Sequence, residues 1–185
     1  ARMTAASALV LCQKKIWSAK LVLSFSLTMT KEKFINRGHG LELYAGVVFL
    51  REFTKMKLLE DILQYHFNNP RLLTQALTHS SITNNEHRNY ERLEFLGDRV
   101  LGMTMAHLLF KMFPDDREGQ LSQRHVKLVC ADAVAEVARK LHLNEYIIAK
   151  DKETIKSVNV LCDVGEAVIG AIYIDSNIEQ AIAFV

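Results

Sequence analysis

Three acidic residues recur at helical spacing in the stretch 89–102. Glu91, Glu94 and Asp98 stand at positions i, i+3 and i+7, so a helix would carry all three on one face. Apolar residues of the same stretch would lie on another face, namely Leu93, Leu96 and Val100. Like charges four residues apart destabilise a helix, and neither Glu94 nor Asp98 has a cation three or four positions away. The acidic face is therefore either solvated or neutralised by something outside the helix.

A second pair of acids favours the latter interpretation. Asp163 and Glu166 are one helical turn apart within an almost entirely apolar stretch, and no Lys or Arg follows Lys156. Carboxylates placed among Val, Ile and Ala are costly unless they are paired or bound to a cation. A solvated face explains this pair poorly, so a bound cation is the better explanation.

Together the two stretches predict a metal site. A cluster of carboxylates without a His or Cys ligand pattern is the donor set that Mg²⁺ prefers. Gly97, Gly165 and Gly170 each weaken a helix relative to Ala, which suggests that the two acid-bearing helices approach closely. We therefore predict a site made of four carboxylates, Glu94, Asp98, Asp163 and Glu166.

The elements that must position these acids are all predicted to be helices. Apolar spacing predicts one helix from about Met56 and another after Asn69, whose side chain would cap a helix beginning at Pro70. A long helix should run from about Asn89 to Met112 and stop before Pro114. Further helices are expected over 118–143, with Asp132 as a possible cap, over 160–174, and after a capping box formed by Ser176 and Glu179. No convincing strand alternation is present, so the fold class is all-α.

Charge divides the chain at about residue 55. Residues 1–55 carry nine Lys or Arg against three acids, a net charge of +6, while residues 56–185 carry fourteen against eighteen, a net charge of −4. By composition alone an acidic main domain argues against a polyanionic partner. Residues 1–55 are interpreted either as a transit peptide or as upstream sequence, and the second is favoured because the chain starts at Ala1 rather than Met.

Three cysteines without a paired spacing, Cys12, Cys130 and Cys162, fit a reducing compartment and are expected to be inert thiols. No apolar run is long enough to cross a bilayer. We therefore expect a cytoplasmic protein without a membrane partner, or a mitochondrial one if residues 1–55 are a transit peptide.

The stretch from Tyr90 to Gly102 resembles the signature of the ribonuclease III family, bacterial type. The stretch 163–171 resembles the second catalytic segment of that family, and Leu77 to Ser80 and Glu118 to Ser122 match in the expected order. Arg99 stands where some members have Ser, and Arg124 and His125 stand where an Arg is often found one position later. The resemblance covers residues 56–185, which would be the catalytic endonuclease domain, truncated at its C-terminal end and without a double-stranded RNA-binding domain.

The resemblance implies that Glu94, Asp98, Asp163 and Glu166 hold catalytic Mg²⁺, with Mn²⁺ able to substitute and no small-molecule cofactor. It implies that Glu91 and Glu118 line the RNA-cleavage groove of a homodimer, although Glu118 could equally be a first-turn helix acid. Phe95 would pack across the dimer interface, with the signature helix at that interface, although it could also be an ordinary core residue. His79 is assigned no catalytic role.

The implied activity is hydrolysis of double-stranded RNA in rRNA and mRNA processing, leaving 5′-phosphate and 3′-hydroxyl ends. One alternative is an RNA-binding or ribosomal scaffold protein that has lost its acids. It is disfavoured because all six acids are present. The other is a helical interaction protein with incidental acidic faces, in which Glu94 and Asp98 could be changed without loss of activity or metal affinity.

Overall fold

A computed structural model describes residues 41–185, and residues 60–185 form one compact unit that contains every predicted site residue. The described part is helical throughout, and its only sheet-like pairing is an isolated bridge between Thr78 and Ile148. The all-α prediction is confirmed for these residues. None of the described helices is both long and apolar enough to span a bilayer.

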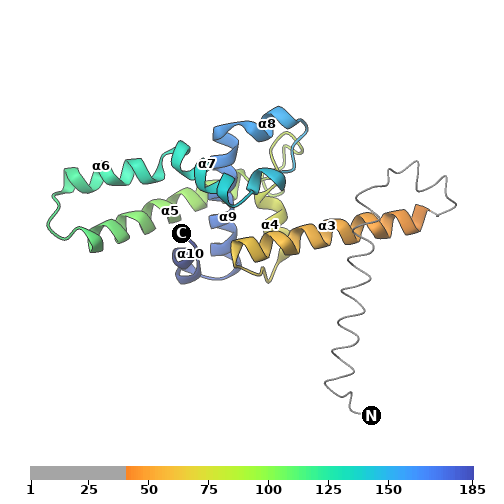
Figure 1. The fold of residues 1–185 in the computed structure, drawn as a ribbon, viewed down its shortest axis with the longest axis horizontal. Helices are drawn as coiled ribbons and strands as arrows, with labels where there is room; N and C mark the ends of the chain where they lie inside the picture. The colour runs from red at the N-terminus through yellow and green to blue at the C-terminus, as the bar shows by residue number, and fades with distance from the viewer. Residues whose placement is uncertain (1–40) are drawn as a thin grey trace, which may run out of the picture. The chain divides into compact units, whose positions relative to one another are not determined.

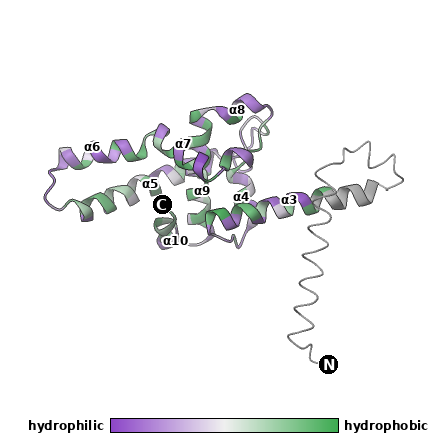
Figure 2. Ribbon diagram, viewed as in Figure 1, coloured by the Kyte–Doolittle hydropathy of each residue, from purple (hydrophilic) through white to green (hydrophobic). Residues whose placement is uncertain are grey.

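Helix α9 lies at the centre of the unit, and other helices pack around it (Figure 1). It spans Val158–Asp175 and includes the predicted helix over 160–174. Figure 2 shows it hydrophobic over much of its length, and eleven of its residues are buried, as expected for a helix enclosed by others. Its most extensive contacts are with α5, Glu91–Met112, and then with α7, Ala131–Lys140. The central helix therefore carries one pair of predicted site acids into the core.

Helix α5 begins and ends close to the predicted residues. The Asn89 side chain accepts a hydrogen bond from the Glu91 backbone N–H, and the helix ends at Met112, two residues before Pro114. Helix α6, Glu118–Val129, follows after a short connection and packs against α5 in a hairpin (Figure 1). No residue of α6 is buried.

The remaining helices are short. Helix α4, Pro70–Ala76, is capped by the Asn69 side chain, which accepts from the Arg71 N–H at 3.2 Å, as predicted. A 3₁₀ turn spans Leu143–Glu145, and helix α8 spans Lys152–Lys156. Helix α10 spans Ile178–Phe184.

Two predicted helix caps are wrong. Asp132 lies in the first turn of α7, where its charge suits the helix dipole, and Cys130 is the residue that precedes the helix. Ser176 does not cap α10, because its hydroxyl donates to the Ile172 carbonyl at the end of α9. Asn177 takes that role instead, and its side chain accepts from the Gln180 N–H at 3.0 Å.

Helix α3 spans Leu41–Leu63 and begins well before the start near Met56 that apolar spacing predicts. Residues 41–55 contain no proline and several good helix formers, so they can be helical without an amphipathic period. The predicted boundary between residues 55 and 56 falls inside this helix, whereas the compact unit begins at Glu60. The interpretation of residues 1–40 lies outside the described residues.

Candidate active site on helices α5 and α9

Two glycines let the backbones of α5 and α9 touch. A Cβ added at Gly97 would lie 1.8 Å from the Glu166 carbonyl oxygen, and one added at Gly170 would lie 2.2 Å from the Leu93 carbonyl oxygen. Only glycine fits at such a contact. The predicted close approach of the two acid-bearing helices is confirmed for these positions, and it places Glu94 and Asp98 opposite Asp163 and Glu166.

Gly165 has a different role from the predicted one. A Cβ added there would meet the Val134 side chain at 3.1 Å, so this glycine faces α7 rather than α5. Residue 165 and residue 170 are five positions apart on α9, which places them on different sides of the helix. Only Gly97 and Gly170 bring the acids together.

The charges of neighbouring predicted ligands act on Glu94 and Glu166. Burial, followed by the charges of Asp163, Glu91 and Asp98, raises the pKa of Glu94 to about 7. Burial also raises the pKa of Glu166 to about 7, and the charges of Asp98, Glu94 and Asp163 add to that rise. Like charges held together in a poorly solvated place disfavour ionisation, so the cluster is suited to receive a cation.

Three neighbours of these carboxylates are not predicted by the sequence pattern. The Tyr90 hydroxyl donates to Asp163 Oδ2 at 3.0 Å, and the Cys162 thiol donates to Glu166 Oε1 at 3.5 Å. Arg99 forms an ion pair with Asp98. Burial, followed by the charge of Glu166, raises the pKa of Cys162, so this cysteine stays a thiol. Each of the three acids therefore has a donor within the protein.

The donor set fits a hard divalent cation, because carboxylate oxygens of one cluster dominate it. In the part of the chain that the structure describes, no three His, Cys, Asp or Glu side chains are arranged to hold a metal ion. Asp98, Asp163 and Glu166 each interact with one of the donors named above.

Glu91 and Glu118, which the resemblance places along the cleavage groove, lie in different parts of the structure. Glu91 begins α5, accepts from the Asn89 side-chain amide at 3.2 Å, and contributes to the raised pKa of Glu94, so it belongs to the cluster. Glu118 begins α6, beyond the far end of α5, and accepts from the Ser122 hydroxyl at 2.7 Å. The 18 residues from Glu94 to Met112 alone span about 27 Å of helix. Within one chain, Glu118 does not join the other acids.

Phe95 lies on the outer face of α5 and is 64% exposed, so it is not a core residue of the single chain. The Arg99 guanidinium lies 4.3 Å from the centroid of its ring. Met103 and Phe110 are 50% and 72% exposed and share this face at helical spacing. Phe95, Met103 and Phe110, here called the outer stripe, form an apolar surface beside the acids.

Hollows in the surface of the unit are lined by different sets of residues. An open one next to the acids is lined by Glu86, Glu91, Arg92 and Phe95. A more enclosed apolar one, lined by residues that include Val134, Val137 and Val168, contains none of the six predicted site acids. Of the six predicted site acids, Glu91 lines the open hollow.

The fold of this chain is similar to that of solved nuclease domains. The nuclease domain of ribonuclease III from Campylobacter jejuni superposes with a TM-score of 0.65 at 38% identity, covering 68% of this chain and 90% of that one. That structure concerns flexibility in a region involved in dimer formation of the nuclease domain. A second structure of the same domain gives a TM-score of 0.64.

The sequence comparisons agree with the structural ones. The family model for Ribonuclease-III-like domains matches residues 69–185. Ribonuclease 3 of Ehrlichia canis (strain Jake) is 40% identical over 136 residues, which are 70% of this chain and 60% of that protein. Ribonuclease 3 of Sinorhizobium fredii is 48% identical over 131 residues, which are 69% of this chain and 55% of that protein. The chain belongs to the ribonuclease III family, and it spans less than two thirds of these two relatives.

Proposed function

We propose that this protein is an endoribonuclease that hydrolyses phosphodiester bonds of double-stranded RNA with divalent metal ions. The observation that carries the proposal is the meeting of Glu94 and Asp98 with Asp163 and Glu166 across a backbone contact between two helices. Its relatives named Ribonuclease 3 support the same reaction. We propose Mg²⁺ as the ion, with Mn²⁺ able to replace it, and no small-molecule cofactor.

The chain's own residues would prepare the site for this ion. Bound Mg²⁺ would lower the pKa of a water and stabilise charge on the attacked phosphate. Glu94 and Glu166 would supply two of the negative charges that hold the ion. Their ionisation is disfavoured in the protein alone, and a bound cation would favour it. Asp98 and Asp163 would complete the set, and Glu91 lies beside Glu94 at the same end of α5. The proposed products are 5′-phosphate and 3′-hydroxyl ends.

The ion would also reconcile the charge of the domain with its substrate. Residues 56–185 carry a net charge of −4, which repels a polyanion. A divalent cation at the carboxylate cluster places positive charge where a phosphate must lie. Weakened RNA binding by the metal-free protein is therefore part of the proposal.

We further propose that the active form is a homodimer built on the outer stripe of α5. The stripe is apolar and exposed in the single chain, and the relative from C. jejuni has a region involved in dimer formation. A partner subunit would cover Phe95. Its Glu118 would then approach the acid cluster of the first subunit, which the Glu118 of that first subunit does not reach. By the family resemblance we propose rRNA and mRNA precursors as substrates, and from the sequence we propose a cytoplasmic location.

The decisive variant is Glu166→Gln, which keeps the shape of the side chain and removes its charge. Changing a residue that only hydrogen-bonds to a metal ligand typically lowers metal affinity or activity about 10–100-fold. Loss of a ligand itself should therefore lower the cleavage rate by more than about 100-fold. Circular dichroism should show an unchanged fold, and a labelled RNA duplex should still bind when Mg²⁺ is present, because Glu94, Asp98 and Asp163 remain to hold the ion. The measurement is the rate of duplex cleavage with Mg²⁺.

Glu136→Gln is the matched control, because Glu136 lies on α7 and pairs with Lys140 at 2.8 Å away from the cluster. It should cleave at the wild-type rate. Cleavage by Glu166→Gln at that rate would refute the site. Absence of Mg²⁺-dependent cleavage by the wild-type protein would instead support the alternative of an RNA-binding scaffold.

A further inference from the structure

Tyr90 links the start of α5 to the second pair of acids. It is the residue just before α5 and is only 4% exposed. Its hydroxyl donates to Asp163 Oδ2 at 3.0 Å, across 73 positions of sequence. The hydrogen bond therefore fixes one oxygen of a predicted metal ligand.

His79 fixes the ring of Tyr90. The two rings meet edge to face, with their centroids 5.5 Å apart. His79 itself cannot turn freely, because its Nδ1 accepts from the Ser81 backbone N–H at 2.9 Å. The Tyr90 backbone N–H donates to the Thr78 carbonyl at 2.9 Å. Both the backbone and the ring of Tyr90 are thus held by residues 78 and 79.

The segment that holds Tyr90 is in turn tied to the stretch before α8. The His79 N–H donates to the Ile148 carbonyl at 2.9 Å, and the Ile148 N–H donates to the Leu77 carbonyl at 2.8 Å. The Lys150 N–H donates to Ser81 Oγ at 3.1 Å. These bonds form a small scaffold beside the acids, made from two stretches far apart in sequence. They give Tyr90 a rigid support.

We propose that Tyr90 is a positioning residue that orients the Asp163 carboxylate for metal binding, and that His79 keeps the Tyr90 ring in place. The inference rests on the proposed metal site. A ligand carboxylate held by a donor loses less freedom when it binds an ion, and such outer-shell donors govern affinity in metal sites generally. His79, for which no catalytic role is predicted, acts here through packing and a fixed ring rather than through proton transfer.

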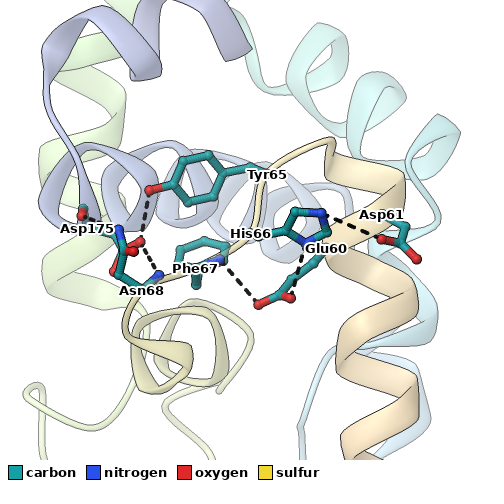
Figure 3. A network of polar contacts seen from close by, with 7 residues as sticks. All are labelled: Glu60, Asp61, Tyr65, His66, Phe67, Asn68 and Asp175. Carbon is teal, nitrogen blue, oxygen red and sulfur yellow. Dashed lines mark hydrogen bonds and ion pairs between the residues drawn. The ribbon is translucent and has the colours of Figure 1, made fainter. Parts of the chain in front are cut away.

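A second tyrosine of the chain, Tyr65, makes an equivalent hydrogen bond at the other end of α9, and it can serve as a control. The Tyr65 hydroxyl donates to Asp175 Oδ2 at 2.8 Å, as Figure 3 shows. Asp175 also accepts from the backbone N–H groups of Asn68 and Asn69, at 2.7 and 2.8 Å. The 12 residues between Asp163 and Asp175 correspond to about 18 Å of helix. Tyr65 therefore makes the same kind of hydrogen bond to α9 without lying at the acids.

The test compares Tyr90→Phe with Tyr65→Phe in the full chain. Both variants keep the ring and lose one Tyr–Asp hydrogen bond, so both should lower the melting temperature slightly. Metal affinity is measured on chelator-treated protein by Mn²⁺ titration, with electron paramagnetic resonance reporting free Mn²⁺. Tyr90→Phe should raise the dissociation constant about 10-fold. Tyr65→Phe should leave it unchanged.

Cleavage provides a second readout. Tyr90→Phe should lose rate at low Mg²⁺ and recover toward the wild-type rate at high Mg²⁺, with the KM for RNA unchanged at saturating metal. A merely structural loss would not be rescued in this way. An unchanged dissociation constant for Mn²⁺ in Tyr90→Phe, or an equal rise in Tyr65→Phe, would overturn the proposal.

A third variant, Asp163→Asn, separates this inference from the proposed function. If Asp163→Asn binds Mn²⁺ as the wild type does, the metal site itself is wrong, and the positioning role is lost with it. If Asp163→Asn loses Mn²⁺ while Tyr90→Phe retains full affinity, only the positioning role fails. His79→Phe keeps an edge-to-face ring and should retain most of the affinity, whereas a loss as large in His79→Phe as in His79→Ala would contradict the packing role of His79.

Discussion

Burial and neighbouring carboxylates disfavour the ionised forms of Glu94 and Glu166 at the contact between α5 and α9, and this makes the metal-free protein sensitive to pH. Their pKa in the folded protein is about 7, above the usual 4.5. A carboxyl group with a raised folded pKa stabilises the fold below its unfolded pKa, and that stabilisation is lost as pH rises through the folded value. In a chelator-treated protein, unfolding by urea should become easier as pH rises from about 4.5 to about 7.

Two comparisons check the cause of that pH dependence. A protein carrying both Glu94→Gln and Glu166→Gln should show a flatter dependence over the same range, because neither amide titrates. Saturating Mg²⁺ should also remove the loss in the wild type, since a bound cation favours the ionised carboxylates. An equally steep loss in the double variant would assign the effect to other groups.

At the residue scale, the sequence predicts the acids but not their neighbours. The spacing of Glu94 and Asp98, and the apolar setting of Asp163 and Glu166, are local patterns, and helical periodicity converts them directly into positions. The bond from Tyr90 to Asp163 joins residues 73 positions apart, so no local pattern predicts it. The pairs of Arg99 with Asp98 and of Cys162 with Glu166 are short-range but depend on side-chain rotamers.

At the scale of elements, the backbone contact at Gly97 and Gly170 between α5 and α9 is the feature most sensitive to mutation. Gly97→Ala would place a methyl group 1.8 Å from the Glu166 carbonyl oxygen, and a backbone atom cannot yield as a side chain can. We expect a loss of about 3 kcal/mol in the free energy of unfolding. Denaturant unfolding followed by circular dichroism measures it, and cleavage should fall because the acids are pushed apart.

Gly119 provides the control for helix propensity. It lies in α6, and an added Cβ would meet nothing within 4 Å. Gly119→Ala should therefore increase the free energy of unfolding by about 0.5–1 kcal/mol, the gain expected from replacing glycine in a helix. If Gly97→Ala were as well tolerated, the close contact between α5 and α9 would be wrong.

The strongly periodic helices are well predicted, whereas the start of α3 and the cap of α10 are not. Long stretches with a clear apolar period, such as those of α5 and α9, start and end within two residues of the predicted positions. The start of α3 was missed because residues 41–55 are helix-forming without being amphipathic. The cap of α10 was misplaced by one residue because Ser176 and Asn177 are both good caps, and only the backbone geometry decides between them.

For the whole molecule, the outer stripe predicts self-association. Sedimentation equilibrium should show a dimer for the wild type. Phe95→Asp combined with Phe110→Asp should shift it toward the monomer, because two charges would replace exposed apolar side chains at the proposed interface. Val137→Asp changes another exposed residue, on α7, and should leave the dimer intact. A fully active monomer in the wild type would contradict the shared cleavage groove.

The +6 charge of residues 1–55 raises a separate question for the whole chain. We predict that it contributes nothing to RNA binding, because its cations are not clustered as in a basic stripe. A chain starting at Met56 should then show the same slope of log affinity against log salt as the full chain. Each phosphate contact would otherwise contribute roughly −0.7 to −0.9 to that slope.

A chain starting at Leu41 is the sharper comparison. Residues 41–55 carry two cations and two acids, so this variant loses the whole net charge of the segment while it keeps helix α3. A shallower salt slope in both shortened chains would show that the segment is an RNA-binding arm. A change only in the chain starting at Met56 would point to the truncated helix rather than to the charge.

The contact between Gly97 and Gly170 also bears on how such a domain can diverge. Two backbones in direct contact set the distance between the helices that carry the four acids, so side-chain volumes in the surrounding core do not set it. Leucines, valines and isoleucines of the core could then be exchanged for one another over time while the geometry of the acids stays the same. The interior can therefore change in sequence without moving the acids, because the distance between the two helices is set at Gly97 and Gly170.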